Sequence, residues 1–270
     1  MYENNSLAHV RCFLLDMDGT FYLGERLLEG ALKFIDVLRQ QGREFLFLTN
    51  NSSKDSTQYA EKITRLGLSI SREKILTSGE ATAMHIQLKK PGARVYIVGT
   101  AALENEFVKR GFVLTHEIPD FAVLGFDTTL TYAKLWTLCD LARAGVPYIA
   151  THPDYNCPTE TGFMPDTGAM IAFVKAATGR EPDLIVGKPN QLFVEKAAER
   201  VGVQVSAMCM IGDRLYTDIA LGVTAGIPTI LVLNGETKAA EVPASPYQPS
   251  YIFQNLGEVA DYLSSISSGK

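Results

Sequence analysis

The sequence predicts an α/β protein in which a parallel sheet is flanked by helices. Short runs rich in β-branched and aromatic residues alternate with helical patterns along the chain, and no internal repeat is present. Hydrophobic residues make up 46% of the 270 residues and charged residues 20%, which supplies ample apolar material for a core. The net charge of −5 argues against a protein that coats nucleic acid, because such proteins normally present a basic surface.

The lack of a recognisable targeting signal and the spacing of the cysteines indicate a cytoplasmic protein. No apolar run approaches the roughly 18 residues that a membrane-spanning helix needs, and residues 1–10 hold no apolar stretch typical of a secretory signal. The polar tail at 264–270 is expected to fray. Four cysteines lie far apart without a CxxC pair, which fits neither a zinc site nor a disulfide framework. They are Cys12, Cys139, Cys157 and Cys209. We therefore expect reduced thiols, no membrane partner and no nucleic-acid partner.

The first part of the chain predicts two strands, each followed by a helix. The expected elements are a strand at 11–16, a helix at 30–41, a strand at 44–48 and a helix at 56–66. One face of the first helix is expected to hold Ala31, Leu32, Ile35 and Leu38, as an amphipathic helix requires. Gly67 follows the second helix, where a C-cap is expected.

The rest of the chain continues the alternation. Its middle part is expected to hold helix 80–89, strand 94–98, helix 102–110, strand 121–125, helix 131–144, strand 146–150 and helix 168–178. The stretch 151–167 shows no period and is expected to be irregular, and 179–183 is expected to be a turn. The last part is expected to hold strand 184–186, helix 190–201, strand 207–211, helix 217–225, strand 228–232 and a helix near 256–264.

Two carboxylates stand where the first predicted strand ends. The strand leads directly into Asp16 and Asp18, and Gly19 follows them. In an open parallel sheet, sites form at the carboxyl ends of the strands. The repulsion between two neighbouring carboxylates must be offset there, and a divalent cation does this well. The alternative for this motif alone is an Asp-Gly turn that closes a hairpin.

Three further strand ends carry polar or charged side chains. The second strand leads into Thr49 and Asn50, where a hydroxyl and backbone N–H groups suit a phosphate. The alternative there is a helix N-cap, for which the serines that follow also qualify. Lys188 follows a later strand and supplies a positive charge for an anion, and Asp213 and Asp218 follow the next one. Together the four strand ends predict a divalent-metal site beside a phosphate site.

At these residues the sequence resembles the haloacid dehalogenase superfamily. The four motifs of that family correspond, in order, to Asp16-Met17-Asp18-Gly19-Thr20, to Thr49, to Lys188, and to Gly212-Asp213 with Asp218. Further similarity at 49–52 and 212–218 is to the NagD-like, p-nitrophenyl phosphatase branch. The resemblance implies a Rossmann-like parallel-sheet core and a Mg²⁺-dependent phosphohydrolase with an aspartyl-phosphate intermediate.

The spacing of the motifs predicts where a second domain is inserted. Asp18 and Thr49 are 31 residues apart, which leaves room for one turn and one helix. Thr49 and Lys188 are 139 residues apart, which leaves room for a whole domain, and the resembled family places its C2-type cap there. We expect a discontinuous core domain at 1–79 and 186–270 and an α/β C2 cap domain at 80–185.

The resemblance also implies catalytic and metal-binding roles. Asp16 is expected to attack phosphorus, and Asp18 to protonate the leaving oxygen and then to activate water. Mg²⁺ is expected on Asp16, on the backbone carbonyl of Asp18 and on Asp213. Superfamily members that cleave carbon–halogen or carbon–phosphorus bonds lack the second aspartate, so Asp18 favours phosphate-ester hydrolysis.

Four residues are implied around the phosphoryl group. Thr49, the Asn50 N–H and Lys188 are expected to hold its oxygens. Asp218 is expected to orient Lys188 or a metal-bound water without binding metal directly.

Two residues of the predicted cap are candidates for contact with substrate. Residues 150–154 are similar to the Ala-Thr-Asn-x-Asp pattern of the family, with His152 in place of the usual asparagine. His152 and Asp154 are therefore expected to bind substrate, and the alternative for His152 is an exposed loop histidine. The resemblance also suggests a homodimer formed through the cap.

These features predict hydrolysis of phosphate monoesters of small metabolites, such as sugar phosphates, nucleotides or aryl phosphates. A phosphotransferase that uses the same intermediate and a non-catalytic binding protein stay open as alternatives. A signalling receiver also combines aspartates, threonine and lysine, but such domains are much shorter and lack a large insertion.

Overall fold

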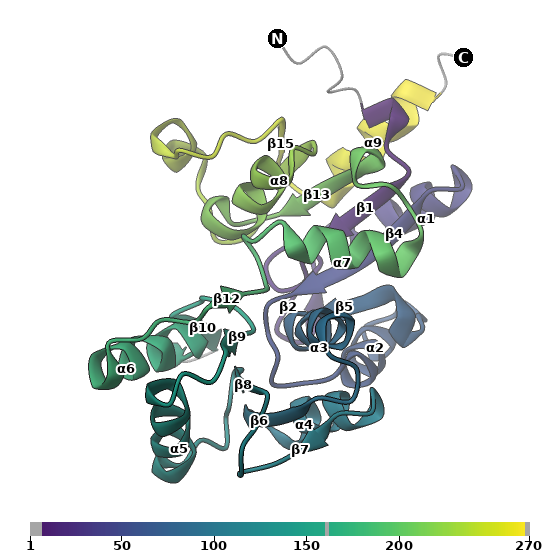
Figure 1. Cartoon of the computed structure of the whole chain (residues 1–270). Coiled ribbons are helices and arrows are strands. Elements are labelled where there is room, and N and C mark those ends of the chain that lie inside the picture. The colour runs from purple at the N-terminus through teal and green to yellow at the C-terminus, as the bar shows by residue number, and fades with distance from the viewer. Residues whose placement is uncertain (1–6, 160–161, 268–270) are drawn as a thin grey trace. The chain divides into compact units, whose positions relative to one another are not determined.

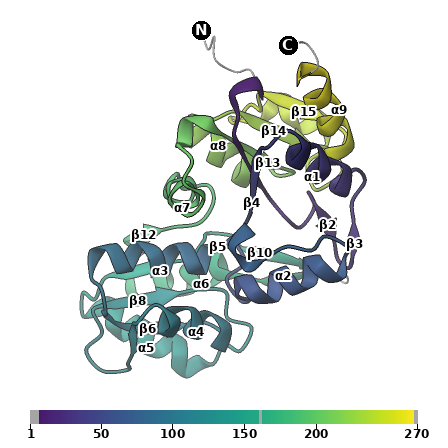
Figure 2. The same ribbon diagram turned by 90° about the vertical axis from the view of Figure 1, so that its right-hand side faces the viewer.

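The computed structural model describes residues 7–159 and 162–267, and the chain forms two compact units (Figures 1 and 2). The first unit comprises Met1–Leu48, Ala60–Leu76 and Lys188–Lys270, and the second comprises Thr49–Tyr59 and Thr77–Gly187. Each unit contains a sheet with parallel strands and helices around it, so the predicted α/β fold class is confirmed. Part of the expected frayed tail, 268–270, lies outside the described residues, as do residues 1–6.

The first unit is built on a six-stranded sheet. Its strands are β1 (Cys12–Leu15), β4 (Glu44–Thr49), β5 (Ile75–Thr77), β13 (Met208–Gly212), β14 (Thr229–Val232) and β15 (Tyr251–Phe253). Their order in space is β15-β14-β13-β1-β4-β5, and the pairs from β15 to β4 are parallel. Leu15 lies opposite both Ile211 of β13 and Phe47 of β4, so these three strands end at one edge of the sheet.

Helices pack around this sheet (Figure 1). They are α1 (Ala31–Gln40), α7 (Leu192–Val201), α8 (Ala220–Ala225) and α9 (Leu256–Ser267), whereas α2 (Ser56–Arg65) begins in the second unit and continues in the first. Phe34 of α1 meets Phe13 of β1 edge-to-face, with ring centroids 5.7 Å apart. Gly30, at a φ of 78°, precedes α1, and a Cβ there would overlap the backbone of Gly257. The first turns of α1 and α9 can therefore approach closely only because position 30 is glycine.

Several short elements of the first unit were not predicted. The antiparallel pair β2 (Tyr22–Leu23) and β3 (Arg26–Leu27) follows β1, and the edge strands β5 and β15 have three residues each. Elements this short contain too few residues for a recognisable period. The predicted helix at 217–225 is divided into a π-helical segment, Leu215–Ile219, and α8.

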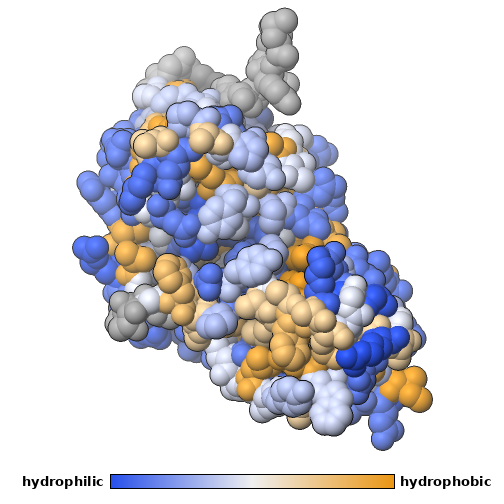
Figure 3. All heavy atoms as spheres, turned by 90° about the vertical axis from the view of Figure 1, so that its left-hand side faces the viewer, coloured by the Kyte–Doolittle hydropathy of each residue, from blue (hydrophilic) through white to orange (hydrophobic). Residues whose placement is uncertain are grey.

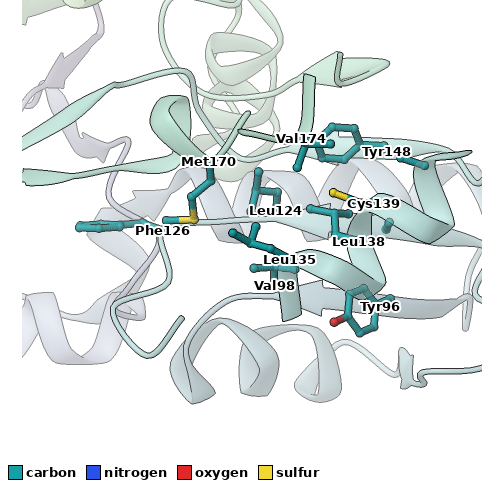
Figure 4. Close-up of a cluster of buried hydrophobic side chains, with 12 residues drawn as sticks. Tyr96, Val98, Leu124, Phe126, Leu135, Leu138, Cys139, Tyr148, Met170 and Val174 are labelled. Carbon is teal, nitrogen blue, oxygen red and sulfur yellow. The ribbon is translucent and has the colours of Figure 1, made fainter. Parts of the chain in front are cut away.

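The second unit contains a five-stranded parallel sheet. Its strands are β6 (Arg94–Val98), β7 (Val113–Leu114), β8 (Phe121–Leu124), β9 (Tyr148–Ala150) and β12 (Leu184–Ile185), in the order β12-β9-β8-β6-β7. Its helices are α3 (Ser78–Lys89), α4 (Ala101–Lys109), α5 (Tyr132–Arg143) and α6 (Thr167–Thr178). Figure 4 shows side chains from this sheet meeting those of α5 and α6, among them Leu124, Leu138 and Val174. These apolar contacts form the core of the second unit.

The stretch 151–167 was expected to be irregular, but part of it forms regular secondary structure. It contains an antiparallel hairpin of β10 (Asn156–Thr159) and β11 (Gly162–Pro165), whose residues 160–161 lie outside the described residues. All four residues of β11 are exposed. Buried and exposed residues do not alternate along β11, so the sequence lacks the two-residue period by which a strand is recognised.

Hydrophobic side chains remain exposed on the second unit. Figure 3 shows apolar surface, in orange, on the face of the chain that it presents. Exposed aromatic side chains of this unit include Tyr132, Trp136, Tyr155, Phe163 and Phe173. Within residues 7–159 and 162–267, no helix combines the length and apolar character needed to cross a membrane. The homodimer through the cap stays a prediction.

Candidate functional site

Lys188 lies between two carboxylates in the first unit. Its Nζ donates to Asp218 Oδ1 at 2.8 Å and to Asp16 Oδ1, and it lies 3.4 Å from the carbonyl oxygen of Leu48. Lys188 is only 3% exposed and Asp218 is fully buried, so water screens these charges little. Burial acts to lower the pKa of Lys188, but Asp16 and Asp218 outweigh it, and the pKa lies above its ordinary value. Lys188 is therefore a permanent cation beside the carboxylate that follows β1.

Asp213, directly after β13, is held tightly by its neighbours. Thr20 Oγ1 donates to its Oδ1 at 3.2 Å, and the backbone N–H of Glu236 donates to its Oδ2 at 2.7 Å. Gly19 and Gly235 lie so close to this carboxylate that a Cβ at either position would overlap Oδ2. The φ of +91° at Gly19 is a second requirement for glycine. The turn after β1 and the loop after β14 thus fix the position of the Asp213 carboxylate.

Asp16, Asp213 and Asp218 form a compact group of carboxylates. One oxygen from each lies within 4.8 Å of the others. Burial raises the pKa of Asp213, and the charges of Asp16 and Asp218 raise it further. Burial also raises the pKa of Asp218, although Lys188 opposes this shift. Burial is the main cause of these pKa shifts, and the excess of negative charge in the group adds to it.

The second cation near this group does not remove the excess. Arg214 Nε lies 2.8 Å from a carboxylate oxygen of Glu236, so Arg214 has an acid partner of its own. Carboxylate oxygens are the ligands that Mg²⁺ prefers in proteins. The excess negative charge and the chemistry of the donor atoms therefore fit a bound Mg²⁺ ion.

Asp18 has surroundings of a different kind. The hydroxyl of Tyr22 donates to Asp18 Oδ2 at 3.2 Å, and Lys62 Nζ lies 4.0 Å from the centroid of the Tyr22 ring. The Asp18 side chain is exposed. Desolvation by the surrounding protein nevertheless raises the pKa of its carboxyl, with Lys62 opposing the shift and Asp16 adding to it. A carboxyl whose pKa is raised towards neutrality is suited to general acid–base catalysis.

Thr49 is the last residue of β4 and, with Asn50, belongs to the second unit. Thr49 Oγ1 accepts a hydrogen bond from the backbone N–H of Asn51 at 3.1 Å. The alternative of an N-cap at the serines that follow is wrong. Asp55 occupies that position before α2, because Asp55 Oδ1 accepts from the Gln58 N–H at 3.0 Å and Gln58 Oε1 accepts from the Asp55 N–H at 3.0 Å.

His152 of the second unit is completely buried, and both of its ring nitrogens have partners. Its Nε2 lies 2.9 Å from Asp166 Oδ1, and its Nδ1 lies 2.9 Å from Thr151 Oγ1 and 3.4 Å from Ser78 Oγ. The alternative of an exposed loop histidine is therefore wrong. Its expected contact with substrate stays a prediction.

Asp154 links two loops of the second unit. Both oxygens of its carboxylate accept from Asn50 Nδ2, at 3.2 and 3.1 Å. Its backbone carbonyl accepts from the N–H of Gly168 in α6 at 2.7 Å. The predicted substrate-binding residues Asn50 and Asp154 are thus in direct contact, and their binding of substrate stays a prediction.

Several residues that contact the predicted site residues were not predicted from the sequence, among them Thr20, Tyr22, Asp166 and Glu236. Thr20 lies inside the first motif but carried no separate signal, and the backbone of Glu236 carried none at all. Tyr22 looked like an ordinary aromatic residue. Asp166 lies two residues before the predicted helix at 168–178, and an aspartate so close to a helix start is a candidate N-cap, which could have drawn attention to it.

Two protein-family models match the chain, and each matched range contains part of the site. The model described as haloacid dehalogenase-like hydrolase matches residues 13–113, and the model described as HAD-hydrolase-like matches residues 185–259. The first range contains Asp16, Asp18 and Thr49, and the second contains Lys188 and Asp213.

Individual proteins resemble the chain over nearly its whole length. An acid sugar phosphatase of Staphylococcus saprophyticus is 36% identical over 258 residues, which are 95% of this chain and 99% of that protein. The crystal structure of a 4-nitrophenylphosphatase from Thermotoga maritima superposes with a TM-score of 0.92 at 47% identity, covering 94% of this chain and 98% of that one. A glycerol phosphate phosphatase from Mycobacterium tuberculosis, solved in complex with magnesium, has a TM-score of 0.85 at 34% identity and covers 93% and 77%.

These likenesses agree with the motifs and with the geometry of the first unit. The matches extend through both units, and the carboxylates and lysine of the motifs lie in contact in the first unit. The chain therefore belongs to the haloacid dehalogenase superfamily, in its NagD-like, p-nitrophenyl phosphatase branch, and is a phosphoric monoester hydrolase.

Proposed function

We propose that this enzyme hydrolyses phosphate monoesters of small metabolites through an aspartyl-phosphate intermediate on Asp16, with Mg²⁺ as its cofactor. The observation that carries the proposal is the buried group of three carboxylates in which Lys188 contacts Asp16 and Asp218. Such a group combines a carboxylate nucleophile, oxygen ligands for a cation and a positive charge for a phosphoryl group.

The covalent chemistry is assigned to Asp16 and Asp18. In the first step an Asp16 oxygen attacks phosphorus, the ester P–O bond breaks, and the leaving oxygen takes a proton from Asp18. In the second step water attacks the acyl phosphate and gives its proton to Asp18, which releases inorganic phosphate and restores the Asp16 carboxylate. The raised pKa of Asp18 supports this double use, because the carboxyl must be protonated in the first step and ionised in the second.

The phosphoryl group is assigned to Lys188, Thr49 and the Asn50 N–H. Lys188 supports this assignment by its charge and by its contact with the nucleophile. Thr49 ends β4 and Asn50 follows it, and β4 is the parallel neighbour of β1. Asp218 is assigned to hold Lys188 in place, since its Oδ1 accepts from Lys188 Nζ at 2.8 Å.

Mg²⁺ is assigned to Asp16, Asp213 and the backbone carbonyl of Asp18. A bound Mg²⁺ ion would screen the nucleophile from the phosphate charge and stabilise the charge that develops on phosphoryl oxygens. The magnesium complex of the glycerol phosphate phosphatase relative supports this metal. Thr20 and the N–H of Glu236 hold the Asp213 carboxylate in one orientation, as an ordered ligand requires.

The proposed substrates are sugar phosphates, nucleotides and aryl phosphates. The acid sugar phosphatase relative supports the sugar phosphates, and the 4-nitrophenylphosphatase relative supports the aryl phosphates. We assign the choice among these substrates to residues 80–185 as a C2 cap, with Asp154 as a candidate contact, and we place the enzyme in the cytoplasm.

The decisive experiment measures p-nitrophenol release from p-nitrophenyl phosphate with Mg²⁺ and with EDTA, for the wild type and for Asp16→Asn. We expect release by the wild type with Mg²⁺ only, and none by the variant. Release by Asp16→Asn at the wild-type rate would overturn the covalent mechanism. A yield of free phosphate lower than that of p-nitrophenol in the presence of glycerol would show a phosphotransferase instead.

A further inference from the structure

The second unit contains a buried chain of hydrogen bonds that none of the proposed catalytic steps uses. It begins in loop 50–53, after β4, continues through loop 151–154, after β9, and ends at the first turn of α6. Its side chains are Ser52, Thr151, His152 and Asp166. Each is at most 4% exposed, so water does not compete for these bonds.

The direction of the hydrogen bond at Asp166 fixes the tautomer of His152. Asp166 Oδ1 already accepts from the backbone N–H of Thr167 at 2.6 Å and from its hydroxyl at 3.1 Å. It therefore acts as an acceptor towards His152 as well, and Nε2 is the donor. With its proton on Nε2, the neutral ring presents Nδ1 as an acceptor.

The remaining protons of the chain then have only one consistent arrangement. The backbone N–H of Phe126 donates to Ser52 Oγ at 2.9 Å. The Ser52 hydroxyl donates to Thr151 Oγ1 at 3.0 Å, and the Thr151 hydroxyl donates to His152 Nδ1 at 2.9 Å. Every hydroxyl gives its one proton to one acceptor, so the position of Ser52 depends on the acceptor at the far end, His152 Nδ1.

Loop 151–154 and the start of α3 also hold the residue next to Ser52. Asn50 Nδ2 donates to the Asp154 carboxylate, and the Ser78 hydroxyl donates to the backbone carbonyl of Asn50. Gly187 leaves room for this arrangement, because a Cβ there would meet Asn50 Oδ1 and lie 3.0 Å from His152 Cβ. Both ends of the Asn50–Ser52 segment are thus tied to residues packed around His152.

We propose that His152 is a positioning residue, which fixes the loop that binds the phosphoryl group by accepting the Thr151 hydroxyl proton at Nδ1. This inference rests on the proposed function, since that function gives the Asn50 N–H its role. His152 then acts on the phosphate through loop 50–53 and does not touch the leaving group. A metal ion on His152, Asp154 and Asp166 fits less well, because Asp166 Oδ1 already has three donors and Asp154 is occupied by Asn50.

Two conservative variants separate the two ring nitrogens. In His152→Asn the amide oxygen takes the place of Nδ1, whereas in His152→Gln the amide group reaches the place of Nε2. We expect His152→Asn to keep the KM for p-nitrophenyl phosphate and the Ki for inorganic phosphate within about twofold of the wild type. We expect His152→Gln to raise both constants by about tenfold, the effect of one lost buried hydrogen bond, with kcat less affected.

A second substrate distinguishes positioning from direct contact. Measured also with a sugar phosphate that the wild type hydrolyses, the KM of His152→Gln should rise by the same factor as with p-nitrophenyl phosphate. Different factors for the two substrates, with an unchanged Ki for phosphate, would show that His152 contacts the leaving group and would overturn the proposal. A loss of kcat alone, with KM and Ki unchanged, would show a merely structural role and would overturn it too.

Thr151 provides the variants to use if His152→Gln does not fold. Thr151→Val removes the hydroxyl while keeping the shape and should raise the Ki for phosphate like His152→Gln, and Thr151→Ser should not. An unchanged Ki in Thr151→Val would contradict the proposal. Failure of the proposed function itself would be recognised separately, since the wild type would then show no Mg²⁺-dependent phosphatase activity.

Discussion

The carboxylate cluster of the first unit and the His152 chain of the second unit differ in how completely their charges and hydrogen-bonding groups are paired. In the first unit, three carboxylates lie close together, Lys188 pairs with two of them, and burial raises the pKa of Asp213 and Asp218. In the second unit, each proton of the His152 chain has an acceptor. An excess of charge marks a place where a cation and a reacting anion can bind, whereas a satisfied network holds a backbone in one conformation. Variants in the two clusters should therefore behave differently.

The largest effect is expected from Asp16→Asn, which removes the nucleophile. Turnover of p-nitrophenyl phosphate should fall by more than about 1,000-fold, because an amide cannot form the acyl phosphate. The melting temperature without Mg²⁺ should not fall, since the change removes one of three crowded carboxylates. A marked loss of stability would show that positive charges already compensate the three carboxylates, so that this cluster has no excess of negative charge.

Lys188→Met should destabilise the first unit most. It leaves the buried Asp218 and the partly buried Asp16 without their shared cation, and the free energy of unfolding should fall by about 4 kcal/mol in urea titrations, with loss of activity. In the double variant Lys188→Met/Asp218→Asn, part of the stability should return while activity stays lost. If Lys188→Met alone is as stable as the wild type, the buried ion pairs do not have the importance assigned to them.

Asp166→Ala should have the largest effect on stability in the second unit. It removes the N-cap of α6 and the partner of His152 Nε2, so the free energy of unfolding should fall by about 3 kcal/mol. Enzyme that remains folded should keep kcat within a few-fold, because Asp166 has no part in the chemical steps. A kcat reduced as strongly as in Asp16→Asn would remove the distinction between the clusters.

Gly19→Ala tests how tightly Asp213 is held. The new Cβ would overlap Asp213 Oδ2, so kcat should fall by about 100-fold and the Mg²⁺ concentration for half-maximal activity should rise. Gly42→Ala is the matched control, because Gly42 also has a positive φ, 62°, but nothing within 4 Å of its Cβ position. Equal kinetics in the two variants would mean that the backbone conformation matters and the crowding does not.

The smallest effect is expected from Lys33→Ala. Lys33 Nζ lies 2.6 Å from Asp261, but both side chains are more than half exposed. Such pairs contribute less than about 1 kcal/mol, so unfolding in urea and the rate of hydrolysis should hardly change. A larger loss of stability would mean that exposed ion pairs are as important in this protein as the buried ones.

The sequence predicted the parallel strands and the family of the chain because buried strands are continuous apolar runs and the motif residues stand directly after them. It did not predict the hairpin between β10 and β11, since the residues of β11 are all exposed. That hairpin brings Asp166 back beside Tyr155, whose carbonyl accepts from the Asp166 N–H at 2.9 Å. The burial of His152 depends on this return of the chain, which local sequence patterns do not contain. The contact of the Glu236 N–H with Asp213 could not be predicted either, because every residue except proline has a backbone N–H and the residue type therefore gives no signal.

The most direct test of the central claim is to stop the reaction with acid during turnover of p-nitrophenyl phosphate and to locate covalent phosphate by peptide mass spectrometry. We expect one phosphoryl group on Asp16 in the wild type, more of it in Asp18→Asn, where the water is not activated, and none in Asp16→Asn. Phosphate on another residue, or active enzyme that never carries phosphate on Asp16, would contradict the account.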